Sequence, residues 1–179
     1  MKKIYYFLFL FLSVVTLNSC LDDNNYEDYA AWKTENEAYF KEMTDTLDAD
    51  GVKYYTQLHS LAYPTYYILY HELTPGKEDG RVPFYNSTVS TNYSGHLYNV
   101  YTNFDSGTGV TFRVDEVIPG WTLALQNMKE GAKWRVVIPW NLAYGANGNT
   151  SIPPYSTLIF DVELVKITKW ETGSNTTTE

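Results

Sequence analysis

Hydrophobic and polar positions follow their most regular pattern between residues 117 and 144. In the first half of this stretch, apolar residues recur at three- and four-residue steps, the spacing of one helical face. They are Trp121, Ala124, Leu125 and Met128. Gly131 follows, where a left-handed residue ends many helices. The pattern predicts a short helix that turns an indole toward the interior and is capped by Gly131.

The hydrophobic period changes to two after Gly131, which indicates a strand. Trp134, Val136 and Ile138 alternate there with Lys133, Arg135 and Val137. Pro139 lacks the next backbone donor and ends the predicted strand. Residues 141–156 form a loop rich in Gly, Asn and Pro, and residues 157–167 then alternate again. The apolar side of this last strand carries Leu158, Phe160, Val162 and Leu164.

Three further stretches are rich in β-branched and aromatic residues and are predicted to be strands. They cover residues 66–73, 83–93 and 110–114, and turn signals such as Thr74-Pro75-Gly76 separate them. Five strands and one helix make an α+β domain in which a curled sheet wraps over the helix.

A helical pattern without Pro or Gly extends from Tyr26 to Leu47. One face carries Tyr29, Trp32, Asn36, Tyr39, Phe40, Met43 and Leu47. This predicts an amphipathic helix of about five or six turns that ends in the segment Asp48 to Gly51. Its aromatic stripe needs a cover, either the protein's own domain or a second copy or partner. Residues 52–62 are predicted to form a second short helix.

The first 20 residues resemble a bacterial export signal that ends in a lipidation site. Two lysines precede an apolar run from Ile4 to Leu17, which is too short to span a bilayer. The residues Leu-Asn-Ser stand before Cys20, the only cysteine in the sequence, so no disulfide is possible within one chain. We expect Cys20 to be acylated and to hold the protein at a membrane. The alternatives are an uncleaved anchor and a cysteine that stands there by chance.

The chain is acidic, with 13 Lys+Arg, 21 Asp+Glu and a formal net charge of −8 at pH 7. Loss of a signal peptide that carries two lysines makes the mature protein more acidic, which disfavours nucleic acid as a partner. Four acidic residues follow Cys20, at positions 22, 23, 27 and 28. In some Gram-negative lipoproteins such a stretch resembles a signal for the outward face; here it is equally a solvated tether. We expect a lipoprotein outside the cytoplasm, in the outer membrane, on either its periplasmic or its outward face.

Several kinds of catalytic site have no candidate in the sequence. His59, His71 and His96 lack the mutual spacing of a metal site. The segment GANGN is not followed by the Lys-Ser/Thr of a phosphate-binding loop, and no nucleophile-elbow pattern occurs. We therefore predict no metal, no cofactor and no covalent nucleophile.

Five segments resemble, in order and with nearly the same spacing, the FKBP-type peptidyl-prolyl cis-trans isomerases. They are VIPGW, MKEGAKW, IPWNLAYGANG, IPP and TLIFDVELVKI. YSGHL and NFDSG extend the resemblance more weakly, so that it covers residues 66–168. It implies an antiparallel five-stranded sheet over one short helix. The predicted parts are a signal peptide (1–19), a lipidated tether (20–25), an N-terminal helical segment (26–65), an isomerase domain (66–169) and a flexible tail (170–179).

The resemblance also implies a set of pocket residues. The family's pocket maps onto Tyr93, Phe104, Asp105, Val117, Ile118, Trp121, Tyr144, Ile152 and Phe160. Trp121 would be the floor under the proline ring, with Phe104 and Phe160 as walls. The Ile118 N–H and the Tyr144 hydroxyl would hydrogen-bond substrate carbonyls. Without the resemblance, Trp121 and Phe160 would be interpreted as ordinary core.

Three positions in this implied pocket raise separate questions. Asp105 would be buried beside Tyr93 with its carboxylate toward the reacting imide; the alternative is a turn-forming Asp before Ser106-Gly107. Val110 is expected to replace an aromatic wall, and Ser151 stands where an apolar residue is common. FKBP-type pockets commonly bind FK-type macrolides and rapamycin. Because of Val110 and Ser151, we expect such ligands to bind here more weakly than to a family member with the full aromatic and apolar set.

The leading functional interpretation is an exported, membrane-anchored prolyl isomerase that acts on unfolded or refolding exported proteins with X-Pro bonds. The alternative is a non-catalytic module that holds proline-containing segments in the same pocket, with the N-terminal helix as a chaperone-like or self-associating surface. A structural or glycan-binding lipoprotein is a third alternative, suggested only by 17 Tyr and five Trp.

Overall fold

The structure is a computed structural model that describes residues 24–61 and 63–170. The predicted signal peptide, Cys20 and nearly all of the predicted tail lie outside these residues. The elements are α1 (Asn24–Asp45), β1 (Thr56–His59), β2 (Tyr67–Thr74), β3 (Thr88–Leu97), β4 (Val100–Arg113), η1 (Val114–Glu116), α2 (Pro119–Leu125), β5 (Lys133–Ile138), η2 (Trp140–Leu142) and β6 (Leu158–Lys169). Within the described ranges, no helix combines the length and the apolar character needed to cross a membrane.

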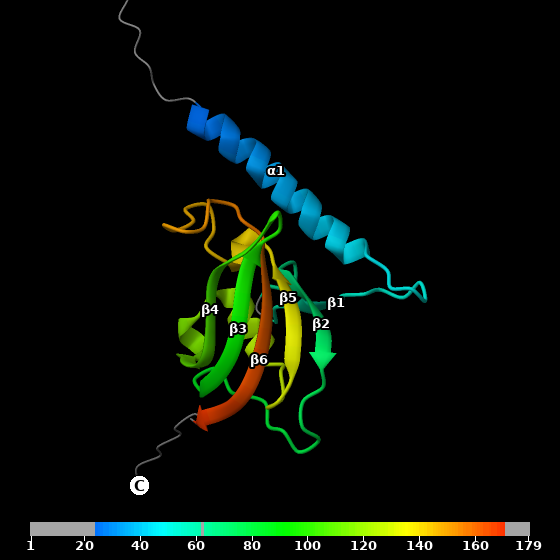
Figure 1. Cartoon of the computed structure of the whole chain (residues 1–179), viewed down its shortest axis with the longest axis vertical. Helices are drawn as coiled ribbons and strands as arrows, with labels where there is room; N and C mark the ends of the chain where they lie inside the picture. The colour runs from blue at the N-terminus through cyan, green and yellow to red at the C-terminus, as the bar shows by residue number, and fades with distance from the viewer. Residues whose placement is uncertain (1–23, 62, 171–179) are drawn as a thin grey trace, which may run out of the picture.

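One sheet of six strands organises the domain, in the order β1-β2-β5-β6-β3-β4 (Figure 1). Every neighbouring pair of strands is antiparallel. The sheet curls over the short helix α2, and a long helix precedes it, so the predicted fold class is confirmed. The strand count is six instead of five because β1 joins the edge beside β2.

One face of the sheet packs on α2 and forms the main core. The apolar side of the predicted helix, including Leu125 and Met128, is fully buried there. Its neighbours come from strands β2, β5 and β6, among them Ile68, Val136 and Leu158. Because burial of one such side chain contributes about 1.5–3 kcal/mol, this face supplies most of the hydrophobic stabilisation of the domain.

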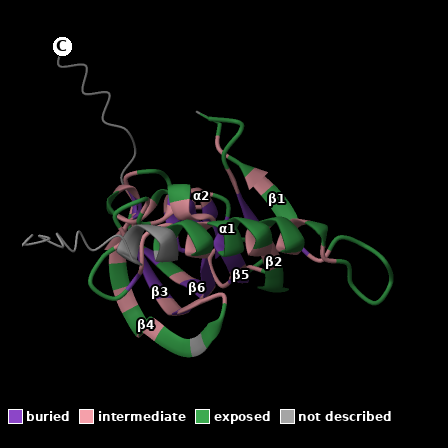
Figure 2. Ribbon diagram, turned by 90° about the horizontal axis from the view of Figure 1, so that it is seen from above, coloured by how far each residue is buried: buried purple, intermediate pink, exposed green. Residues whose placement is uncertain are grey.

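The opposite face of the sheet packs on α1. Leu69, Val137 and Ile159 are neighbours on three adjacent strands and alternate with the residues that face α2. Tyr39 and Phe40 of α1 pack on this row, and α1 crosses this side of the molecule (Figure 2). The middle of the aromatic stripe, with Tyr39, Phe40 and Met43, is therefore covered by the protein's own domain, whereas Tyr29 and Leu47 at its two ends are exposed. Val137, on the more polar side of its strand, is buried for the same reason.

Two local predictions were wrong. Residues 52–62 contain β1 instead of a helix, because Thr56 pairs with Tyr70 and His59 with Tyr67 in the sheet. Helix α2 ends at Leu125, so Gly131 does not cap it, although its φ of 85° is left-handed. Gly131 lies instead in the turn before β5, where its N–H donates to the Leu164 carbonyl at 2.6 Å.

Candidate functional site

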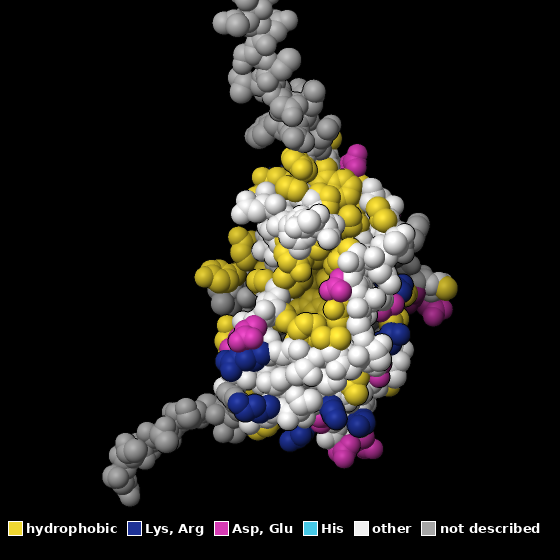
Figure 3. Space-filling view, turned by 60° about the vertical axis from the view of Figure 1, so that its left-hand side comes forward, with side chains coloured by type: hydrophobic (Ala, Val, Ile, Leu, Met, Phe, Trp, Pro, Cys, Tyr) yellow, Lys and Arg dark blue, Asp and Glu magenta, His cyan; other side chains and the backbone are white. Residues whose placement is uncertain are grey.

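An apolar cavity of about 280 Å³ lies beside α2 and the curled sheet. Its lining consists of Tyr93, Phe104, Asp105, Phe112, Glu116, Val117, Ile118, Trp121, Tyr144 and Phe160. Figure 3 shows hydrophobic side chains filling a hollow in the surface, with acidic side chains near its edge. The structure therefore brings together the sequence-predicted site residues, apart from Ile152 and Val110.

The local sequence sets how deeply Trp121 lies. Ile118 is the N-cap of α2, and Pro119 stands in the first turn, where its missing N–H leaves no helical bond unmade. Gly120 has no Cβ, and the Ile138 side chain of β5 occupies the space that a Cβ would need. Helix α2 therefore approaches β5 closely, and Trp121 is only 5% exposed.

Three aromatic rings meet Trp121 edge to face. The ring centroids lie 5.2 Å away for Tyr93, 5.5 Å for Phe112 and 5.2 Å for Phe160, with interplanar angles of 88°, 74° and 84°. Phe104 meets Phe160 in the same way at 5.5 Å. Each such pair contributes about 0.5–1.5 kcal/mol beyond its burial, so the rings hold one another in place.

Gly95 allows two of these walls to approach each other. In the sheet it pairs with Asp105 of β4 and with Phe160 of β6. The rings of Phe160 and Phe104 occupy the space that its Cβ would need. Any larger residue at position 95 would displace the wall, which is why the segment YSGHL carries a glycine there.

A hydrogen bond joins two polar residues of the lining. The Tyr93 hydroxyl donates to Asp105 Oδ2 at 3.0 Å. Burial, then this hydrogen bond and the negative charge of Asp105, raise the pKa of Tyr93 to about 12. The expectation that Asp105 is buried was wrong: it is exposed, because it lies on the edge strand β4. It pairs there with Gly95, so the alternative of a turn-forming Asp is also wrong.

Two hydrogen-bond donors stand at the cavity. Tyr144 is 39% exposed, and partial burial, then the charge of Asp105, raise its pKa further above neutral pH. The Ile118 carbonyl accepts the N–H groups of Trp121 and Thr122 at 2.9 and 3.1 Å. The Ile118 N–H has no acceptor among the described residues. Both donors are available to a ligand in the cavity.

Ile152 and Ser151 line a second cavity, of about 380 Å³, next to the first. The two cavities share Phe104, Asp105 and Tyr144. Asn149 shapes the loop here, since its Oδ1 accepts the N–H groups of Ser151 and Ile152 at 2.8 and 2.9 Å. Ile152 is therefore close to the main cavity without lining it, and Ser151 faces the neighbouring space.

Phe112 takes the place that Val110 was expected to hold, so the Val110 assignment was wrong. The two residues share one side of β4, because they are two positions apart. The register of β3 and β4 shifts between Thr91 and Tyr93, and Val110 packs against Gly107. The Phe112 ring meets Trp121 and lines the cavity, whereas Val110 is not part of the lining. Phe112 is the only aromatic residue in the predicted strand 110–114, which is the signal that could have identified it.

The indole N–H of Trp121 is buried without a hydrogen-bond partner in the described part of the chain. Trp134 is in the same state, but it stacks on Tyr70 at 4.1 Å and does not line the cavity. Buried donors without partners are uncommon in folded proteins. The two indole N–H groups are thus in the same state, but only Trp121 lines the cavity.

A family model described as FKBP-type peptidyl-prolyl cis-trans isomerase matches residues 81–165. The relative FkpA of Escherichia coli (strain K12) is 45% identical over 106 residues, which make up 56% of this chain and 37% of FkpA. Outer membrane protein MIP of Legionella longbeachae is 43% identical over 100 residues, or 53% of this chain and 39% of MIP. The chain thus spans less than half the length of these two relatives.

Solved structures extend the likeness to the whole domain. The crystal structure of a peptidyl-prolyl cis-trans isomerase from Pseudomonas syringae pv. tomato is 36% identical, with a TM-score of 0.63, and the match covers 77% of this chain and 95% of that one. The crystal structure of E. coli FkpA is 34% identical, with a TM-score of 0.69, and the match covers 84% of this chain and 65% of that one.

Tyr93 is expected to ionise near pH 12, and Asp105→Asn is expected to lower this pKa, because it removes a negative charge that opposes ionisation. Burial remains the first cause, so the pKa should stay above the value of about 10 for an exposed tyrosine. NMR titration of ¹³C-labelled tyrosines, with the Tyr93 signal assigned through Tyr93→Phe, measures both values.

Tyr98 is the internal control, since its pKa is also raised to about 12, by burial and then by a hydrogen bond to Glu35. The pKa of Tyr98 should not change in Asp105→Asn. An unchanged pKa of Tyr93 would contradict the hydrogen bond described above. Because folding raises the pKa of Tyr93, its contribution to stability is complete below about pH 10 and is lost as the pH rises toward 12.

Proposed function

Because the chain belongs to the FKBP-type peptidyl-prolyl cis-trans isomerase family, we propose that it catalyses the cis-trans isomerisation of X-Pro bonds in the cavity over Trp121. The main support is that a buried indole lines an apolar cavity beside the Ile118 N–H and the Tyr144 hydroxyl, two donors for which the described residues provide no acceptor. The substrates would be unfolded or refolding exported polypeptides.

The chemistry needs an apolar environment more than it needs reactive groups. The barrier to rotation about the amide bond is about 18–20 kcal/mol, because resonance gives the C–N bond double-bond character. Resonance also places partial charges on the oxygen and nitrogen, and twisting the bond removes them. Water stabilises the planar, more polar state, so a cavity walled by Trp121, Phe112 and Phe160 favours the twisted state. No cofactor takes part in this step.

The polar groups would orient the substrate. The Tyr144 hydroxyl would donate to one substrate carbonyl, and the Ile118 N–H to another. Asp105, with one carboxylate oxygen accepting from Tyr93, would face the imide with its negative charge. Holding the peptide in a turned conformation lowers the entropy that must be lost to reach the twisted state.

A non-catalytic module that holds proline-containing segments is the alternative function. It would use the same cavity and the same donors, and it would bind proline peptides without accelerating their isomerisation. The macrolide ligands implied by the resemblance would compete for this cavity too. Phe112 supplies the aromatic wall that Val110 was expected to lack, which leaves only Ser151 as a reason for weaker binding.

We further infer a lipoprotein anchored at the outer membrane through Cys20. Its support is the sequence around Cys20 and the name of the relative MIP, an outer membrane protein. Self-association through α1 would have to use the helix surface that does not pack on Leu69, Val137 and Ile159, since Tyr39, Phe40 and Met43 are already covered.

Tyr144→Phe is expected to lower kcat/KM for X-Pro peptides by roughly fivefold, which corresponds to the loss of about 1 kcal/mol from one hydrogen bond in the transition state. Packing should be unchanged, because only a partly exposed hydroxyl is removed. A protease-free isomerisation assay, run on proteins shown to be folded by circular dichroism, measures the ratio.

Tyr66→Phe is the matched control, because Tyr66 is 42% exposed and lies outside the cavity lining. It should keep the wild-type rate. If the folded wild-type protein binds proline peptides but does not accelerate their isomerisation, the enzyme proposal fails and the binding module replaces it.

Cys20→Ala is expected to abolish acylation and to leave an unprocessed precursor or a soluble protein, since the acyl chains supply the anchor. Cell fractionation gives the location of the variant, and mass spectrometry of the mature N-terminus gives the state of Cys20. A wild-type protein in the membrane fraction with an unmodified Cys20 would disprove the lipoprotein assignment.

A further inference from the structure

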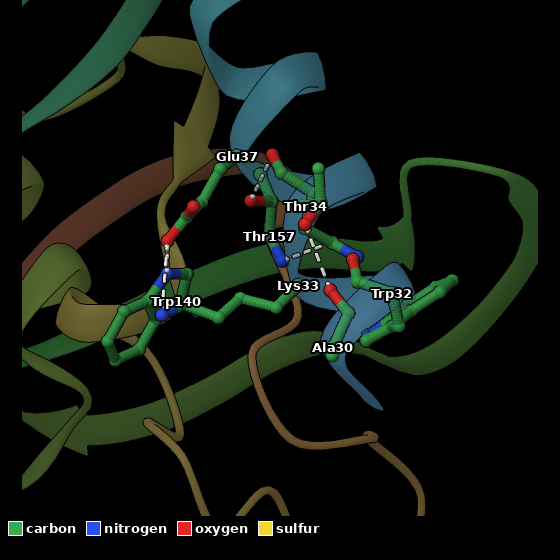
Figure 4. A network of polar contacts seen from close by, with 8 residues as sticks. Ala30, Trp32, Lys33, Thr34, Glu37, Trp140 and Thr157 are labelled. Atoms are coloured by element: carbon green, nitrogen blue, oxygen red, sulfur yellow. Dashed lines mark hydrogen bonds and ion pairs between the residues drawn. The ribbon is translucent and has the colours of Figure 1, made fainter. Parts of the chain in front are cut away.

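The segment that carries Tyr144 is bound to the N-terminal helix α1 by side-chain contacts. This helix lies outside the residues matched by the family model. We call residues 140–157, between β5 and β6, the Tyr144 loop. Glu37 Oε1 of α1 accepts the indole N–H of Trp140 at 3.1 Å (Figure 4). Lys33 Nζ lies 3.8 Å from the same carboxylate oxygen and 5.4 Å from the centroid of the Trp140 ring.

Trp140 in turn holds the backbone on both sides of Tyr144. Its carbonyl accepts the N–H of Ala143 at 3.1 Å and the N–H of Gly145 at 2.9 Å. The Gly145 carbonyl accepts the N–H of Tyr155 at 2.9 Å. Tyr144 thus stands between two residues whose amides are both bonded to Trp140.

Tyr155, near the other end of the loop, packs against Trp140 and Lys33. Its ring meets the Trp140 ring edge to face at 5.1 Å, and Lys33 Nζ lies 5.2 Å from its centroid. Tyr155 is also the only non-glycine residue in the described ranges with a positive φ, of 60°. Such a conformation persists only where the surroundings hold it. The contacts with Trp140 and Lys33, and the bond to Gly145, are those surroundings.

The end of the Tyr144 loop is held by two polar groups of the same helix, from the buried Asn36 and the half-buried Trp32. Asn36 is fully buried, and its Oδ1 accepts the N–H of Thr157 at 2.7 Å. The Trp32 indole N–H donates to Ser156 Oγ at 3.1 Å. Both ends of the loop therefore depend on α1. Figure 4 shows Glu37 of the helix reaching Trp140, with Thr157 of the loop beside the helix.

We propose that Glu37 and Lys33 are positioning residues, which hold the Tyr144 hydroxyl at the cavity through Trp140 and Tyr155. This rests on the proposed function only for its effect on rate. The two side chains are 51% and 40% exposed, so their ion pair contributes little to folding stability. Their contacts act on the geometry of the Tyr144 loop, and small displacements of a substrate-binding group reduce rates strongly.

Glu37→Ala is expected to lower kcat/KM about three- to tenfold, because Trp140 loses its acceptor and Tyr144 loses its fixed place. Glu37→Gln keeps an acceptor oxygen and should stay within about twofold of wild type. Glu42→Ala, on an exposed part of the same helix, is the control and should have no effect.

A double-mutant cycle separates positioning from a general structural role. In a Tyr144→Phe background, Glu37→Ala should have less than about a twofold effect, because the group that it positions is already gone. The same fold loss in both backgrounds, or no loss in Glu37→Ala alone, would overturn the proposal.

Hydrogen exchange tests the proposal without enzyme activity. Glu37→Ala should accelerate exchange of the Gly145 and Tyr155 amides relative to Glu42→Ala, with amides of β6 unchanged. If the wild-type protein is not an isomerase, the proposed function fails and exchange alone decides the positioning role. Unchanged exchange at both amides would then disprove it.

Discussion

The edge-to-face packing of Tyr93, Phe112 and Phe160 around Trp121 is the contact on which the site depends. The three rings come from β3, β4 and β6, so they converge only because the sheet curls around α2. Convergence also requires two residues without a Cβ atom. Gly95 leaves room for the rings of Phe160 and Phe104, and Gly120 leaves room for β5 beside α2. The cavity is thus a consequence of close packing between helix and sheet.

Local pattern and resemblance together predicted much of this arrangement. The three- and four-residue spacing placed Trp121 on the buried side of a helix, and the alternation of the last strand placed Phe160 on its inner side. Phe112 was missed because Val110 and Phe112 lie on the same side of β4, and the alternation along a strand does not distinguish two positions on one side. The exposure of Asp105 was missed because it depends on β4 being the edge strand, a property of the whole sheet.

Long-range contacts explain the other differences between the predicted and the observed structure. The segment 52–62 is a strand because Thr56 and its neighbours pair with β2, and no local pattern reports such pairing. Asn36, an amide within an aromatic stripe, is explained only by the bond that it makes to Thr157, 121 residues away. The same helix covers one face of the sheet and holds the Tyr144 loop, so the N-terminal segment and the site form one structural unit.

We propose that the indole of Trp121 is the floor under a bound proline ring. The indole N–H signals of ¹⁵N-labelled protein, followed while an X-Pro peptide is added, test this placement, because the indole N–H groups of Trp121 and Trp134 are both buried without hydrogen-bond partners among the residues that the structure describes. The Trp121 signal is predicted to shift with saturation, and the Trp134 signal to stay in place. If other signals show that the protein is saturated with peptide and the Trp121 signal has not shifted, the proline ring does not lie on Trp121.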